Sequence, residues 1–135
     1  GGNWKGAGTA WKLTEDGHDV ILVTPDPMVG RELQRTAADF PLRRRLAGLG
    51  VRFVLESAIL EWTGKAAKVI CFLDGSEQWI EADTLVMSTT NMANDVEHQA
   101  LEQAGFKARL IGDAAAPRPA PYAIHEGRKA ALAIK

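Results

Sequence analysis

Apolar and polar positions along the chain alternate between a helical and a strand period. Trp4, Ala7 and Trp11 recur at helical spacing, which predicts an amphipathic helix near the start. That helix is expected to end near Gly17, because glycine is common just beyond a helix end. Residues 18–24 are nearly all apolar, as expected of a strand in a parallel sheet that is covered on both faces. A helix followed by a buried strand is a repeating unit of α/β proteins.

The middle of the chain repeats this unit and then changes character. Leu42, Leu46 and Leu49 predict a helix over residues 41–49, followed by a strand at 51–55. Three short β-like segments come next, at residues 59–62, 67–73 and 78–81. Asp74-Gly75 separates the last two and is typical of a hairpin turn. These segments predict a small antiparallel meander inserted at about residues 58–82.

The last third returns to alternating strands and helices. We expect strands at residues 83–88 and 108–112, and helices at 94–104 and 121–134. Asn94 and Glu97 have the spacing of a capping box at the start of the first of these helices. The predicted fold class is α/β, with a Rossmann-like parallel sheet, helices on both faces and the inserted meander. We expect one domain over residues 1–135, closed by a C-terminal segment at 108–135.

The start of the chain suggests that this domain is partial. Gly1-Gly2-Asn3-Trp4 has no methionine and no strand before it, although the fold calls for a first strand there. Without that strand the neighbouring strand edges would be unpaired. We therefore expect a piece of a larger protein, and an isolated chain that forms a homo-oligomer to cover those edges.

Charge and apolar runs exclude several classes of partner. The net charge of −1 argues against a nucleic-acid-binding protein, which would be basic. No apolar run approaches the roughly 20 residues that cross a bilayer. The first residues also lack the apolar core of a signal peptide. We expect a cytoplasmic protein that binds neither nucleic acid nor membranes.

Reactive side chains are few. Cys71 is the only cysteine, and His18, His98 and His125 have no metal-ligand spacing. No nucleophile–histidine–acid set or carboxylate pair has a useful spacing. His125 and Glu126 are sequence neighbours on a predicted helix, so they point in different directions. We therefore expect neither a metal site nor catalytic residues in this chain.

Three stretches carry a family resemblance, at residues 1–10 with 17–25, at 81–95, and at 110–114 with 124–131. They resemble the C-terminal nucleotide-binding region of the trimethylamine dehydrogenase and 2,4-dienoyl-CoA reductase group. These are Old Yellow Enzyme-type NADH:flavin oxidoreductases, whose C-terminal region has a pyridine-nucleotide-disulfide-reductase-like fold. In that group an N-terminal barrel carries FMN and a 4Fe-4S cluster. The resemblance implies that the parent is a flavin-dependent oxidoreductase with that barrel as this region's partner, and with its catalytic residues in the barrel.

The first stretch corresponds to the glycine turn of a dinucleotide fold, in which a pyrophosphate meets the N-terminus of a helix. The candidate cofactor contacts in it are Gly1, Gly2, Asn3 and Gly6. Asn3 stands where the second glycine allows close approach of the pyrophosphate. Thr24 ends the second strand, where NAD-binding proteins usually place an acidic residue for the ribose. These departures favour a vestigial site over an NAD(P) site, and the resemblance to the trimethylamine dehydrogenase branch implies a site of the ADP type.

The third stretch resembles the flavoprotein Gly-Asp motif. The resemblance implies that Asp113 accepts hydrogen bonds from hydroxyls of the sugar-like chain of FAD. Gly112 would then allow close approach, and Ala114 would offer its backbone N–H.

Three functional interpretations remain open at this point. The chain is a region of a flavin-dependent amine dehydrogenase or enoate reductase with an ADP-type or vestigial site. Alternatively, it is an NAD(P)H-binding domain that delivers hydride to a flavin. The third interpretation is a non-catalytic domain used for packing or subunit association. Asn3 and Thr24 disfavour the second interpretation, and Asp113 disfavours the third.

Overall fold

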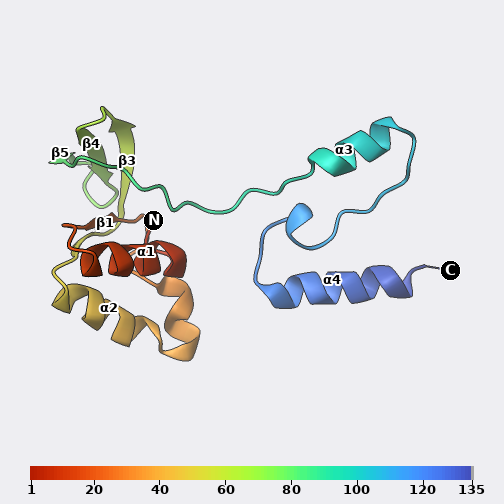
Figure 1. Ribbon diagram of the computed structural model, residues 1–135, viewed down its shortest axis with the longest axis horizontal. Helices are drawn as coiled ribbons and strands as arrows, with labels where there is room; N and C mark the ends of the chain where they lie inside the picture. The colour runs from red at the N-terminus through yellow and green to blue at the C-terminus, as the bar shows by residue number, and fades with distance from the viewer. Residues whose placement is uncertain (135) are drawn as a thin grey trace. The chain divides into compact units, whose positions relative to one another are not determined.

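A computed structural model describes residues 1–134 of the 135-residue chain. The chain divides into two compact units, Gly1–Thr89 and Thr90–Lys135, which we describe separately (Figure 1). We call them unit 1 and unit 2.

Unit 1 opens with two helices that alternate with two parallel strands. Its elements are α1 (Trp4–Glu15), β1 (Ile21–Val23), the 3-10 helix η1 (Arg31–Thr36), α2 (Asp39–Gly48) and β2 (Arg52–Val54). β1 pairs in parallel with β2, with Leu22 opposite Phe53. The predicted helix–strand–helix–strand order is therefore confirmed, while η1 has no counterpart in the prediction.

The predicted meander follows directly. Its strands are β3 (Ser57–Trp62), β4 (Ala66–Cys71) and β5 (Glu77–Glu81), which form one antiparallel sheet in the order β3-β4-β5. A register shift between Ile59 and Glu61 interrupts the β3–β4 ladder. The α/β class with a parallel sheet and a separate antiparallel sheet is thus confirmed.

The parallel strands are covered on both faces, but by different layers. Leu22 lies in a core cluster with residues of both helices, Ala7, Ala10 and Leu46 among them. Ile21, Val23 and Val54 instead pack against a second cluster built from the meander, Ala67, Val69 and Ile80. Successive side chains of a strand point to opposite faces, so this alternation supplies both clusters. In Figure 1, α1 and α2 lie on one side of β1 and the meander lies on the other.

Helices were expected on both faces, and the second face differs from that expectation. In the described part of unit 1 the meander takes the place of a second helical layer, since it follows β2 after a short turn. Its apolar residues already alternate with the strand period, and they bury one face of the small sheet against β1 and β2.

Unit 2 contains α3 (Val96–Gln103), the 3-10 helix η2 (Gly112–Ala114) and α4 (Ala120–Leu132). Among its described residues only Gly112 is buried. None of the described helices in either unit is long and apolar enough to cross a membrane.

Two predicted strands are wrong. Residues 83–88 and 108–112 form no strand, because a strand needs a neighbouring backbone for its ladder and no described segment pairs with either stretch. The predicted capping box of α3 is also wrong. The N-cap residue is Asp95, whose side chain makes no capping bond. Asn94 instead accepts a long hydrogen bond of 3.5 Å from the Val96 N–H.

Candidate functional site

The turn that enters α1 is closely packed around Gly6. A Cβ atom at Gly6 would lie 1.9 Å from the carbonyl oxygen of Gly1 and 3.0 Å from Oγ of Ser88. Real Cβ atoms essentially never approach other atoms so closely, so only glycine fits here. The start of α1 therefore lies in close contact with the backbone of Gly1 at this position.

Asn3 caps α1 with its side chain. Its Oδ1 accepts a hydrogen bond of 2.8 Å from the Gly6 N–H, and Oγ of Ser88 donates a longer one of 3.3 Å to the same atom. The backbone oxygen of Asn3 accepts from the Ala7 N–H at 2.8 Å. Asparagine is a favoured N-cap because it satisfies N–H groups that have no partner inside the helix. Here its side chain occupies the Gly6 N–H, which a phosphate would otherwise meet.

A carboxylate of the chain reaches the same helix end. Glu32, on η1, accepts a short hydrogen bond from the Trp4 N–H through its Oε1. The N-terminus of a helix carries partial positive charge, so a carboxylate is stabilised there as a phosphate would be. A pyrophosphate at this position would be repelled by Glu32 and would have to displace it.

Thr24 lies against this turn but is fully buried. A Cβ atom at Gly2 would be 2.9 to 3.0 Å from three side-chain atoms of Thr24, so the two residues are in close contact. The Thr24 hydroxyl accepts a hydrogen bond of 3.3 Å from the Asp26 N–H. Its place at the end of β1 is as predicted, but its burial leaves no surface for a ribose.

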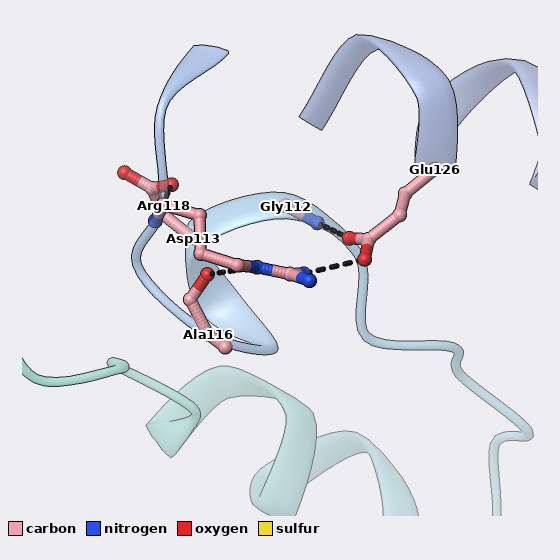
Figure 2. A network of polar contacts seen from close by, with 5 residues as sticks. All are labelled: Gly112, Asp113, Ala116, Arg118 and Glu126. Carbon is pink, nitrogen blue, oxygen red and sulfur yellow. Dashed lines mark hydrogen bonds and ion pairs between the residues drawn. The ribbon is translucent and has the colours of Figure 1, made fainter. Parts of the chain in front are cut away.

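The Gly-Asp turn lies in unit 2 and is held against α4 (Figure 2). Gly112 has φ +60°, in the left-handed region that favours glycine, and a Cβ atom there would lie 3.2 Å from Cβ of Ala123. Asp113 is exposed, and Ala114 is partly buried. The three residues form η2, and Oδ1 of the exposed Asp113 accepts a long hydrogen bond of 3.5 Å from the Arg118 N–H.

Glu126 connects α4 to this turn. Its Oε2 accepts a hydrogen bond of 2.8 Å from the Gly112 N–H, and its Oε1 forms a short ion pair with Nη2 of Arg118. The Gly112 hydrogen bond and, after it, the Arg118 side chain lower the pKa of the Glu126 carboxyl. Glu126 is therefore ionised at neutral pH, with both carboxylate oxygens already bonded.

We expect a Gly112→Ala variant to destabilise unit 2 by about 1–2 kcal/mol, because alanine is strained in the left-handed region and would press on Ala123. Gly127→Ala is the matched control, since it lies in α4 and a Cβ there meets nothing within 4 Å. Alanine at Gly127 should stabilise the helix by up to about 1 kcal/mol. Amide exchange of the α4 backbone measures both effects, and equal protection in the two variants would contradict the expectation.

The predicted site residues fall into two groups. One unit holds Gly1, Gly2, Asn3, Gly6 and Thr24 around the start of α1, and the other unit holds Gly112, Asp113 and Ala114. The prediction missed Glu32, Arg118 and Glu126. Glu32 stands in a polar stretch without a motif. Glu126 reaches Gly112 only because α4 folds back on the turn, so spacing along the chain gave no signal for it.

Within residues 1–134, no three histidine, cysteine, aspartate or glutamate side chains come together in a way that could hold a metal ion.

Solved structures, in contrast to sequences, give clear matches. No protein-family model matches the chain, and no curated protein matches it by sequence. Histamine dehydrogenase from Rhizobium sp. 4-9 matches 98% of the chain at 26% identity with a TM-score of 0.82. The 6-hydroxypseudooxynicotine amine oxidase HisD from Pseudomonas geniculata N1 matches 97% at 25% identity with a TM-score of 0.84. A complex of 2-naphthoyl-CoA reductase with 2-naphthoyl-CoA matches 100% at 25% identity with a TM-score of 0.75.

These three enzymes belong to the family that the sequence resembles. The resemblance to the trimethylamine dehydrogenase and 2,4-dienoyl-CoA reductase group is therefore confirmed at the level of the family. The chain spans only 20 to 22% of the length of each matched structure, so it is similar to one region of these flavin-dependent oxidoreductases.

Proposed function

We propose that the chain is a nucleotide-binding-like region of a flavin-dependent oxidoreductase, with a vestigial site at α1 and a flavin contact at Gly112-Asp113-Ala114. The observation that carries the proposal is the contrast between the two turns. Asn3 and Glu32 bond the N–H groups of Gly6 and Trp4 at the start of α1, whereas the Asp113 carboxylate is exposed on a turn that the fold holds in place.

The start of α1 does not fit a pyrophosphate. A phosphate needs free N–H groups and a favourable field, but the Gly6 N–H is bonded to Asn3 and the Trp4 N–H to Glu32. The buried Thr24 offers no acceptor to a ribose. These contacts support a vestigial site over an ADP-type site, and both over an NAD(P)H site that feeds hydride to a flavin.

The Gly-Asp turn fits a flavin nucleotide. An exposed carboxylate accepts hydrogen bonds from ligand hydroxyls, and bonds to a charged group are among the stronger ones. Asp113 would hold the sugar-like chain of FAD, with the Ala114 N–H beside it. When bound, the flavin would supply the electron-transfer chemistry of the parent. FMN, a 4Fe-4S cluster, the catalytic residues and a barrel partner are assigned by this proposal to other regions of the parent.

Calorimetric titration of the purified chain with ADP, NADH, NADPH and FAD tests the proposal. We expect saturable binding of FAD alone, weakened about tenfold by Asp113→Asn through the loss of one charged hydrogen-bond acceptor. Asp83→Asn is the matched control, because it removes the same charge from a side chain that is 93% exposed in unit 1.

Other outcomes would point to the competing interpretations. Binding of ADP alone would favour an ADP-type site at α1, and preference for NADPH would favour hydride delivery. FAD binding that Asp113→Asn leaves unchanged would remove the proposed contact.

A further inference from the structure

We propose that Glu126 is a positioning residue, which holds the Gly112-Asp113-Ala114 turn in the conformation that presents Asp113 to a flavin nucleotide. The inference rests on the proposed function for its ligand, but the contacts that carry it lie within unit 2. We call Gly112, Arg118 and Glu126 the Glu126 cluster.

Both carboxylate oxygens of Glu126 have partners within unit 2. Figure 2 shows it reaching from α4 toward the turn, with one oxygen on the Gly112 N–H and the other on Arg118. One oxygen accepts from the Gly112 N–H at 2.8 Å and the other forms the short ion pair with Arg118, so each oxygen has a partner within unit 2. A charged acceptor makes a stronger bond to a backbone N–H than a neutral one does. The side chain is therefore suited to hold the backbone of the turn.

Gly112 is held at both of its backbone polar groups. Glu126 takes its N–H, and its carbonyl oxygen accepts hydrogen bonds from the N–H groups of Ala115 and Ala116 at 3.1 and 3.0 Å. Asp113 follows directly in the chain, so its backbone is fixed by the bonds on either side of it. A left-handed Gly112 has alternative conformations available, and the Glu126 bond selects one of them.

Arg118 closes the other end of the turn. Its Nε donates to the carbonyl oxygen of Ala116 at 3.1 Å, while its guanidinium pairs with Glu126 and lies 5.2 Å from the ring centroid of Tyr122. Both Tyr122 and Glu126 are on α4. One side chain therefore links the end of the turn to the helix at two points, and it also satisfies the second oxygen of Glu126.

The Glu126 cluster is expected to affect the position of the Gly112-Asp113-Ala114 turn more than the folding stability of unit 2. The Arg118 and Glu126 side chains are 36% and 28% exposed, and ion pairs with this exposure add little to folding stability. A ligand contact, by contrast, depends on the position of its partner to within a fraction of an ångström. Loss of Glu126 should consequently weaken ligand binding more than it weakens the fold.

Two variants of Glu126 test the inference. Glu126→Ala removes the acceptor of the Gly112 N–H, whereas Glu126→Gln keeps an amide oxygen in the same place. Glu97→Ala is the control, since it removes an exposed glutamate from α3 in the same unit. The readouts are exchange of the Gly112 amide proton, followed by NMR, and affinity for FAD, followed by calorimetry.

We expect Glu126→Ala to speed Gly112 amide exchange and to weaken FAD binding, each by about tenfold or more. Glu126→Gln should recover part of both, because its single amide oxygen can accept from the Gly112 N–H but its NH2 group cannot accept from Arg118, and Glu97→Ala should change neither. The inference is overturned if Gly112 exchanges at the wild-type rate in Glu126→Ala, or if FAD binds that variant as tightly as the wild type. If Glu126→Ala does not fold, a folded Glu126→Gln in which the Gly112 amide exchanges as fast as an unprotected amide also overturns it.

The two readouts separate this inference from the proposed function. A wild-type chain that does not bind FAD would refute the flavin contact. Faster Gly112 exchange in Glu126→Ala would then still support the positioning role of Glu126, and unchanged exchange would refute that role as well.

Discussion

A Gly6→Ala variant should lose about 3 kcal/mol of unfolding free energy in unit 1. The added methyl group would lie 1.9 Å from the backbone oxygen of Gly1, which cannot swing away as the end of a flexible side chain could. Overpacking of this kind typically costs about 1–3 kcal/mol and sometimes more, and here backbone must move. Urea denaturation followed by tryptophan fluorescence measures the loss, since all four tryptophans lie in unit 1.

Gly8→Ala is the control for this variant. Gly8 lies on the same helix, two residues further on, and a Cβ there would meet nothing within 4 Å. Alanine is about 1 kcal/mol more favourable than glycine inside a helix, so this variant should gain stability. If both Gly6→Ala and Gly8→Ala increased the unfolding free energy, the close approach of α1 to the turn at Gly1 would be refuted.

The second large effect is expected for Leu46→Ala, which should destabilise unit 1 by about 2–5 kcal/mol. Leu46 is fully buried in the core cluster that joins both helices to the parallel strands. Its truncation removes buried apolar surface and leaves a cavity in this cluster, because the surrounding helices and strands can relax only partly into the space. The same denaturation experiment applies, because Trp11 packs against this cluster.

Leu60→Ala makes the same chemical change at an exposed position. Leu60 lies on β3 and is 53% exposed, so its truncation should cost less than about 1 kcal/mol. A similar loss in both variants would show that Leu46 does not lie in a closed core.

The sequence predicted the elements of unit 1 because their signals are local. The Trp4–Ala7–Trp11 spacing predicts α1, and Asp74-Gly75 marks the turn between β4 and β5, whatever the rest of the chain does. The strands expected at 83–88 and 108–112 needed more than local signals. Apolar residues there satisfy the strand pattern, but a ladder requires a second backbone that the pattern cannot supply. The meander on the second face of the parallel sheet is likewise a consequence of packing.

The candidate site divides in the same way. Gly6 could be named as a candidate because the glycine spacing of a dinucleotide turn is a local pattern, and the structure places it in close contact with Gly1. Glu32 could not, because it reaches the Trp4 N–H across 28 positions of the chain. Glu126 lies 14 positions from Gly112 and meets it through the return of α4. Both glutamates accept hydrogen bonds from backbone N–H groups, and which N–H groups lie within reach of them is decided only by the folded structure.

The two sheets of unit 1 also differ in how far apart along the chain their paired residues lie. In the meander, Trp62 pairs with Ala67 only five positions later, whereas in the parallel pair Ile21 meets Arg52 after 31 positions. Closing a longer loop costs more conformational entropy before any contact compensates for it, and hairpins form within microseconds. We therefore expect the meander to form early in folding and to offer a preformed apolar surface. β1 and β2 would then pair on that surface. The docking of α1 and α2 on the other face of these strands would complete the slower, rate-limiting part of folding.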